Sequence, residues 1–72
     1  MLWSTDNTKK YDRKNLRRRD GVMISPRRRN VGGGWDIVEL KDGGIEYIHE
    51  NLDIWQLCAI LNASEAEPVG DS

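Results

Sequence analysis

The chain has 72 residues, with one cysteine, one histidine and a formal net charge of −1. One cysteine and one histidine cannot supply a Cys/His zinc site or an internal disulfide, so we expect neither a metal nor another cofactor. No apolar run approaches the roughly 18 residues that span a bilayer, and the polar N-terminus lacks the apolar region of a signal peptide. These features predict a cytoplasmic protein with no membrane partner.

The near-neutral net charge hides a strong separation of charge along the chain. Residues 1–29 contain ten of the eleven basic residues and three acids, a formal charge of +7. Residues 30–72 contain Lys41 and nine acids, a formal charge of −8. Such opposed halves are typical of a basic segment that binds a polyanion, joined to an acidic body.

Residues 1–20 are predicted to form a basic N-terminal arm. Ser4, Thr5 and Asp6 are good helix N-caps, and no glycine or proline occurs before Gly21. A helix would place four cations on one face, namely Lys10, Arg13, Lys14 and Arg17. Because like charges at this spacing repel, we expect the arm to be partly helical or disordered alone and to become helical on an anionic partner.

Residues 21–62 are predicted to form the folded domain. Its first element is a short strand at 21–25 that ends at Pro26, because proline cannot donate a hydrogen bond to a sheet. The polar, glycine-rich stretch 27–34 predicts a loop, in which three successive glycines would let the preceding arginines move relative to the sheet.

A β-hairpin follows in the sequence. Residues 35–40 and 45–50 are rich in strand-forming residues, and 41–44 (KDGG) is a turn signal with Asp42-Gly43 at its tip. This hairpin is the strongest local pattern in the chain.

A C-terminal helix is predicted after Asn51, which we expect to be its N-cap. Its core stripe has helical spacing and consists of Ile54, Leu57, Cys58 and Leu61. The helix is also apolar at Trp55 and Ile60, so a sheet on one side would leave a face for a homodimer contact or a host protein. Residues 63–72 are acidic and low in apolar content, which predicts a disordered acidic tail.

The predicted fold is therefore α+β: a small three-stranded antiparallel sheet packed on one C-terminal helix and preceded by the basic arm. This order of elements is similar to that of the small DNA-binding modules at the N-termini of some tyrosine recombinases and of plant AP2 domains. In those modules a three-stranded sheet backed by one helix binds DNA, often with a basic arm in front. The resemblance covers residues 21–62 as an element order, implies a DNA-binding sheet, and identifies no individual site residue.

The basic cluster predicts the main function, a small non-enzymatic accessory or regulatory protein that binds DNA or RNA, of a kind that phages and mobile elements encode. Lysine and arginine neutralise phosphates, and arginine also pairs with guanine edges. The stretch SPRR resembles the Ser-Pro-basic-basic repeats of sperm histones. The alternative interpretations are a solvated tail and a segment folded back on the acidic half. The predicted nucleic-acid-binding residues are Lys9, Lys10, Arg13, Lys14, Arg17, Arg18, Arg19, Arg27, Arg28 and Arg29.

An alternative function uses the acidic body. In this hypothesis the protein is an inhibitor or adaptor of host transcription or defence machinery that docks in a basic nucleic-acid channel. Closely spaced acids would imitate a row of phosphates, while aromatic side chains would dominate the binding energy. The predicted partner-binding residues are Asp36, Glu39, Glu46, Glu50, Asp53, Trp55 and Ile60.

Two aromatic residues suggest a further possibility for single strands or RNA. Trp3 and Tyr11 lie in or near the basic segment, and bases stack on exposed aromatic rings.

One pattern resembles a catalytic site. Glu39 and Lys41 have the E-x-K spacing of restriction-type nucleases, with Asp20 or Asp36 as a metal partner. That core needs helices on both faces of its sheet, for which this chain is too short. The sequence therefore predicts no catalytic residue and no enzyme.

Overall fold

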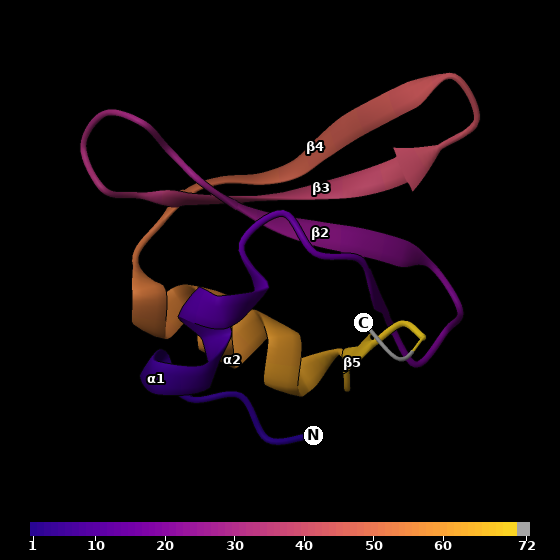
Figure 1. The fold of residues 1–72 in the computed structure, drawn as a ribbon, viewed down its shortest axis with the longest axis horizontal. Helices are drawn as coiled ribbons and strands as arrows, with labels where there is room; N and C mark the ends of the chain where they lie inside the picture. The colour runs from indigo at the N-terminus through magenta and orange to yellow at the C-terminus, as the bar shows by residue number, and fades with distance from the viewer. Residues whose placement is uncertain (71–72) are drawn as a thin grey trace.

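The computed structural model describes residues 1–70, which form one antiparallel sheet with helices on one side (Figure 1). The strands are β1 (Leu16–Arg17), β2 (Met23–Arg28), β3 (Trp35–Lys41), β4 (Gly44–Leu52) and β5 (Glu67–Pro68), in the spatial order β4-β3-β2-β1-β5. The helices are α1 (Thr5–Thr8), the 3-10 turn η1 (Lys9–Tyr11) and α2 (Ile54–Ala63). We call the side of the sheet that α1 and α2 cover the helix face, and the opposite side the outer face.

The α+β class is confirmed, but the predicted three-stranded sheet is wrong because the sheet has five strands. The two additional strands come from the segments predicted as an arm and a tail. Leu16 in β1 pairs with Ile24 of β2 on one side and with Pro68 of β5 on the other. The first 20 residues and the segment after α2 therefore lie against each other within the sheet.

The N-terminal segment is helical only at its start. Ser4 and Asn7 form a capping box, in which the Asn7 N–H donates to Ser4 Oγ and the Ser4 N–H donates to Asn7 Oδ1 at 2.8 Å. The helical turns end at Tyr11, and Arg13 has a left-handed backbone with φ of 63°. The basic helical stripe predicted for the arm is therefore wrong, because its members lie on different elements.

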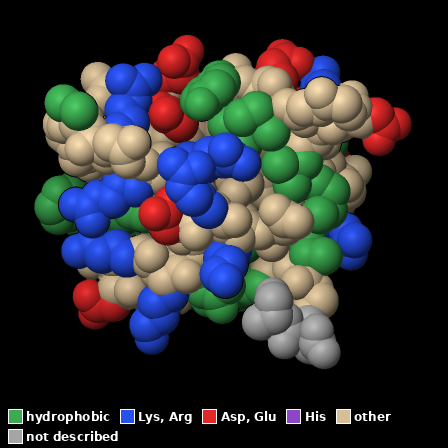
Figure 2. Space-filling model, turned by 45° about the horizontal axis from the view of Figure 1, so that its top comes forward, with side chains coloured by type: hydrophobic (Ala, Val, Ile, Leu, Met, Phe, Trp, Pro, Cys, Tyr) green, Lys and Arg blue, Asp and Glu red, His purple; other side chains and the backbone are tan. Residues whose placement is uncertain are grey.

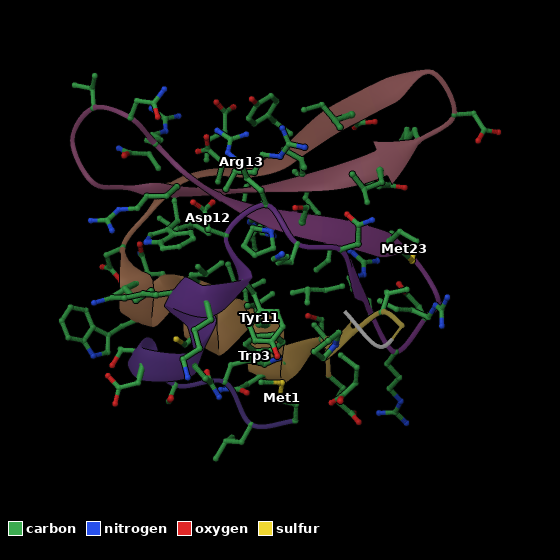
Figure 3. All side chains as sticks on the ribbon, viewed as in Figure 1. Met1, Trp3, Tyr11, Asp12, Arg13 and Met23 are labelled. Atoms are coloured by element: carbon green, nitrogen blue, oxygen red, sulfur yellow. The ribbon has the colours of Figure 1, made fainter. Side chains whose placement is uncertain are left out.

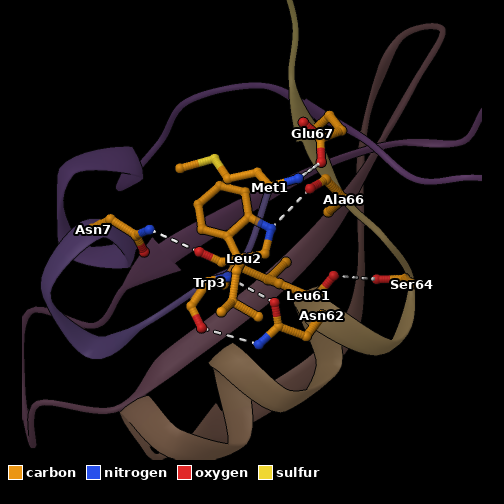
Figure 4. Close-up of polar contacts among 9 residues, drawn as sticks. All are labelled: Met1, Leu2, Trp3, Asn7, Leu61, Asn62, Ser64, Ala66 and Glu67. Atoms are coloured by element: carbon orange, nitrogen blue, oxygen red, sulfur yellow. Dashed lines mark hydrogen bonds and ion pairs between the residues drawn. The ribbon is translucent and has the colours of Figure 1, made fainter.

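Trp3 connects this segment to the C-terminal part of the chain (Figure 4). Its side chain is 3% exposed, and its indole N–H donates to the Ala66 carbonyl at 2.8 Å. The Asn62 side-chain amide accepts from the Trp3 N–H at 2.7 Å and donates to the Trp3 carbonyl at 3.0 Å. The terminal ammonium of Met1 also forms an ion pair with Glu67. Burial of the indole with its polar groups paired makes this segment part of the core.

Strand β2 continues past the proline at which it was predicted to end. Pro26 pairs with Ile37 of β3, and its carbonyl accepts a hydrogen bond from the Arg13 N–H at 2.7 Å. Arg27 and Arg28 therefore belong to β2, and the flexible loop predicted to begin at residue 27 is wrong at these two positions. The loop between β2 and β3 is closed by a hydrogen bond from the Arg29 N–H to the Gly34 carbonyl at 2.8 Å.

The predicted hairpin is confirmed as β3 and β4. Its turn is at Asp42 and Gly43, where Gly43 has a φ of 85° that a residue with a Cβ adopts at a cost. The pairing is irregular near Ile48, because Ile37 pairs with His49 while Val38 pairs with Tyr47. This bulge turns Ile48 toward the core, against which it packs.

Helix α2 packs on the sheet through the predicted stripe. Leu57, Cys58 and Leu61 are buried and Ile54 is half-buried against the core. The N-cap is Asp53 and not the predicted Asn51. The reason is a capping box with Gln56, whose N–H donates to Asp53 Oδ1 at 2.8 Å.

The core lies between α2, the N-terminal segment and the helix face. Its buried members are Trp3, Leu16, Ile24, Trp35, Ile37, Leu57, Cys58, Leu61 and Ala66. Within residues 1–70, no helix has the length and apolar character needed to span a membrane.

Candidate nucleic-acid interface

The register of the strands determines which side chains lie on the outer face of the sheet. Ile24 belongs to the core, so Ser25 and Arg27, at odd spacing from it, lie on the opposite side. Arg27 lies opposite Asp36 of β3. Ser25 lies opposite Val38, which lies opposite Tyr47 of β4. The outer face thus carries arginine, an acid and an aromatic residue on three neighbouring strands.

These strands border an open hollow of about 370 Å³, which we call the arginine hollow. Its lining residues are Arg13, Arg27, Arg28, Arg29, Asn30, Val31, Asp36 and Tyr47. Figure 2 shows Lys and Arg side chains gathered over the left and centre of one view of the surface, with hydrophobic side chains beside them. Four arginines and one aspartate border the hollow, which therefore has an excess of positive charge.

Arg29 is held by acids of its own molecule. Its Nε donates to Asp36 Oδ1 at 2.9 Å, and its Nη2 lies 3.4 Å from Glu50 Oε1. The hydrogen bond with Asp36 is the main cause that raises the pKa of Arg29, which stays charged. This arginine is a fixed part of the wall and is not free to move on a glycine hinge.

Asp36 is buried, and its carboxylate remains ionised. Desolvation, the largest single effect, acts to raise its pKa. Hydrogen bonds from the Asn51 N–H and Arg29, both to Oδ1 at 2.9 Å, together with the charge of Arg29, outweigh that effect and lower the pKa. The carboxylate is thus committed to Arg29 and to the backbone of β4.

Arg27 has no such partner. It is half-buried, and its Nε atom is buried without a hydrogen-bond partner within residues 1–70. The acid opposite it in the sheet, Asp36, is already bonded to Arg29. A half-buried guanidinium without an acidic partner favours a bound anion, because the charge of the anion offsets the cost of desolvating the cation.

The loop before β1 places Arg13 at the same hollow (Figure 3). The Arg13 N–H donates to the Pro26 carbonyl, and Asp12 Oδ1 accepts from the Arg28 N–H at 2.9 Å. Figure 3 shows Trp3 and Tyr11 together on the helix side, whereas Arg13 lies at the level of the sheet. These backbone contacts fix the loop against the end of β2.

The other predicted nucleic-acid-binding residues lie elsewhere. Lys9 and Lys10 are exposed on η1, and Lys14 and Arg17 are exposed in the following loop and β1. Lys9, Lys10, Arg13, Lys14, Arg17, Arg27 and Arg28 form no ion pair with any residue of 1–70. The structure therefore does not bring all ten cations together, although most of them remain unpaired.

Arg18 and Arg19 border a different hollow, of about 450 Å³, beside the end of α2. Arg18 forms an ion pair with Asp20, and Arg19 Nη1 lies 2.7 Å from Glu65 Oε2. The hydrogen bond from Arg18 is the main cause that lowers the pKa of Asp20 to about 2. Because both arginines have acidic partners, this hollow is less suited to an anion than the arginine hollow.

The acids predicted to imitate a phosphate row do not form one surface. Asp36 is buried beside Arg29, and Asp53 caps α2. Glu39 lies opposite the core residue Ile24, hence on the helix face, and pairs in register with Glu46. Glu50 lies beside Arg29.

The two apolar members of the predicted partner surface also differ in environment. Trp55 is 72% exposed on α2. Ile60 is half-buried against the core and lines an apolar hollow between α2 and β4.

The residues that resemble a nuclease core are separated. Glu39 lies on the helix face and Asp36 on the outer face. Lys41 Nζ forms an ion pair with Glu46 Oε1 at 2.6 Å. Within the described part of the chain, no three His, Cys, Asp or Glu residues are grouped as metal ligands.

The aromatic residue at the hollow is one that the sequence did not indicate. Trp3 is buried, and Tyr11 contacts it edge to face, with ring centroids 5.1 Å apart. Tyr47 instead is 51% exposed and lines the arginine hollow. The alternation in IEYIHE, with Ile45 and Tyr47 on one face, is the signal from which it could have been found.

Comparisons of this chain with protein-family models, with curated proteins and with solved structures found no match.

Proposed function

We propose that this protein is a small, cytoplasmic, non-enzymatic nucleic-acid-binding protein that contacts phosphates through the arginine hollow. The observation that carries the proposal is Arg27, whose buried Nε has no partner although an acid lies opposite it in the sheet. Asp36, the acid opposite Arg27, is bonded to Arg29 instead.

The surroundings of Arg27 suit a phosphate. Arg13 and Arg28 line the same hollow, and neither forms an ion pair within residues 1–70. Arginine binds phosphate oxygens through paired hydrogen bonds, which are stronger than neutral ones. Arginines without an ion pair around one open hollow therefore supply both the charge and the donors for a phosphate backbone.

Charge removal at the hollow tests this function. Binding of a fluorescent oligonucleotide is measured by anisotropy for the wild type, for Arg13→Gln/Arg27→Gln and for the control Arg18→Gln/Arg19→Gln. Each variant removes two positive charges, but the control removes arginines that already have acidic partners.

We expect the variant with both arginines of the hollow replaced to bind at least about tenfold more weakly at low salt. The slope of the logarithm of its binding constant against the logarithm of the salt concentration should also be shallower, by roughly 0.7–0.9 for each lost phosphate contact. The control should lose much less affinity. Equal losses in both variants would show that general charge, and not the hollow, drives binding. Absence of wild-type binding at low salt would contradict the proposed function itself.

A further inference from the structure

The arginine hollow contains an exposed aromatic ring. Tyr47 lies on β4 between the bulge and the hairpin turn, and its side chain is 51% exposed. The other large aromatic residues do not line the hollow. Trp3 and Trp35 are each 3% exposed in the core, and Trp55 lies on α2.

Apolar side chains neighbour Tyr47 on the outer face. Val38, directly opposite it in the sheet, is fully buried, and the next outer-face pair is Leu40 and Ile45. Ile45 is exposed, as is Val31 at the other side of the hollow. An aromatic ring with apolar neighbours suits the flat, weakly polar face of a nucleobase.

The exposed ring of Tyr47 favours unpaired bases. Both helices lie on the helix face, so within residues 1–70 the outer face presents strands and the side chains on them (Figure 1). In a duplex the base faces are stacked on one another and a ring on a sheet cannot reach them, whereas a single strand presents them freely.

We propose that the arginine hollow binds single-stranded nucleic acid, with one base stacked on Tyr47 and the adjoining phosphates contacted by Arg13 and Arg27. This inference rests on the proposed function and adds to it the class of nucleic acid. The combination of an aromatic platform with neighbouring cations is the arrangement by which proteins bind single strands with little dependence on sequence.

A comparison of strand types tests the inference. Labelled oligothymidine, oligouridine and a DNA duplex of equal length are titrated with the wild type, Tyr47→Phe, Tyr47→Thr and the control Trp55→Ala, which removes an exposed aromatic side chain on α2. Thermal unfolding followed by circular dichroism checks that each variant is folded. Both single strands should bind more tightly than the duplex, and a difference between them would show whether the ribose hydroxyl contributes.

Loss of one base–aromatic stack should weaken single-strand binding about 5- to 100-fold in Tyr47→Thr. Tyr47→Phe keeps the ring and should remain within about threefold of the wild type, as should Trp55→Ala, which leaves Tyr47 in place. A second measurement uses the wild type alone and so does not depend on the folding of a variant. Photocrosslinking to an oligonucleotide that contains 5-iodouracil should modify the peptide containing Tyr47.

The outcomes separate the two proposals. Equal binding of duplex and single strands, with Tyr47→Thr unchanged or the crosslink on another peptide, would overturn the stacking inference and leave the phosphate-binding function in place. No binding of any of the three nucleic acids at low salt would overturn both.

Discussion

The indole N–H of Trp3 donates a hydrogen bond to the carbonyl of Ala66 at 2.8 Å, and this contact joins residues near the two ends of the chain. Asn62 strengthens the connection through two hydrogen bonds with the Trp3 backbone. The basic N-terminal segment is therefore packed against α2 and positions Arg13 beside β2. Folding and the geometry of the arginine hollow depend on the same segment.

Trp3→Ala should lower the free energy of unfolding by about 3–5 kcal/mol, because it removes a large buried ring and leaves a cavity. Trp3→Phe should cost less, roughly 1–3 kcal/mol, since it keeps most of the ring but leaves the Ala66 carbonyl unpaired. Urea denaturation followed by circular dichroism measures both. Trp55→Ala, at an exposed position, is the control and should change stability by less than about 0.5 kcal/mol. Equal effects at Trp3 and Trp55 would contradict this account of the core.

Replacement of the α2 N-cap, Asp53, should also lower stability. Asp53→Ala removes the acceptor for the Gln56 N–H and should destabilise the protein by about 1 kcal/mol. Asp53→Asn keeps an acceptor oxygen and should stay close to the wild type in the same denaturation experiment. An Asp53→Ala variant as stable as the wild type would show that Asp53 does not cap the helix.

Stability should depend on acid through Asp20 and Asp36. Both have a folded-state pKa below the ordinary value, to about 2 for Asp20, so their stabilising effect is complete above the unfolded pKa of about 3.9. It is lost as pH falls from about 4 through the folded pKa values. The denaturation midpoint of the wild type should therefore decrease as the pH is lowered from about 6 to about 2, and the midpoint of Asp36→Asn should decrease less.

The matched control for this pH series is Asp42→Asn in the hairpin turn. Asp42 forms no ion pair within residues 1–70, and asparagine is equally suited to the turn. This variant should keep the pH dependence of the wild type. An Asp36→Asn variant with an unchanged pH profile would argue against the ionised state assigned to Asp36.

Parts of the fold could be predicted because they depend on local patterns. The hairpin follows from Asp42-Gly43 between strand-forming residues, and α2 follows from the spacing of Leu57, Cys58 and Leu61. Strands β1 and β5 have two residues each, and such short strands leave no periodic signal. They exist because tertiary contacts such as those of Trp3 bring them together, so a three-strand sheet was predicted where five form.

The sequence indicated that the candidate site would be rich in arginine, but not which residues would form it. The local sequence around Arg27 predicts a loop, because proline and glycine flank the arginines, yet pairing with β3 makes it a strand. Which arginine is paired depends on the register that places Asp36 and Glu50 near Arg29. Such long-range pairing is not visible in a single sequence.

A map of amide chemical shifts tests most directly whether the arginine hollow binds single-stranded nucleic acid. Nitrogen-15-labelled protein is titrated with oligothymidine at low salt. We expect the largest chemical-shift changes at Arg13, Arg27 and Tyr47 around the arginine hollow, and only small changes along α2. Shifts concentrated at Lys9 and Lys10 or along α2, or no shifts at a large excess of oligonucleotide, would contradict it.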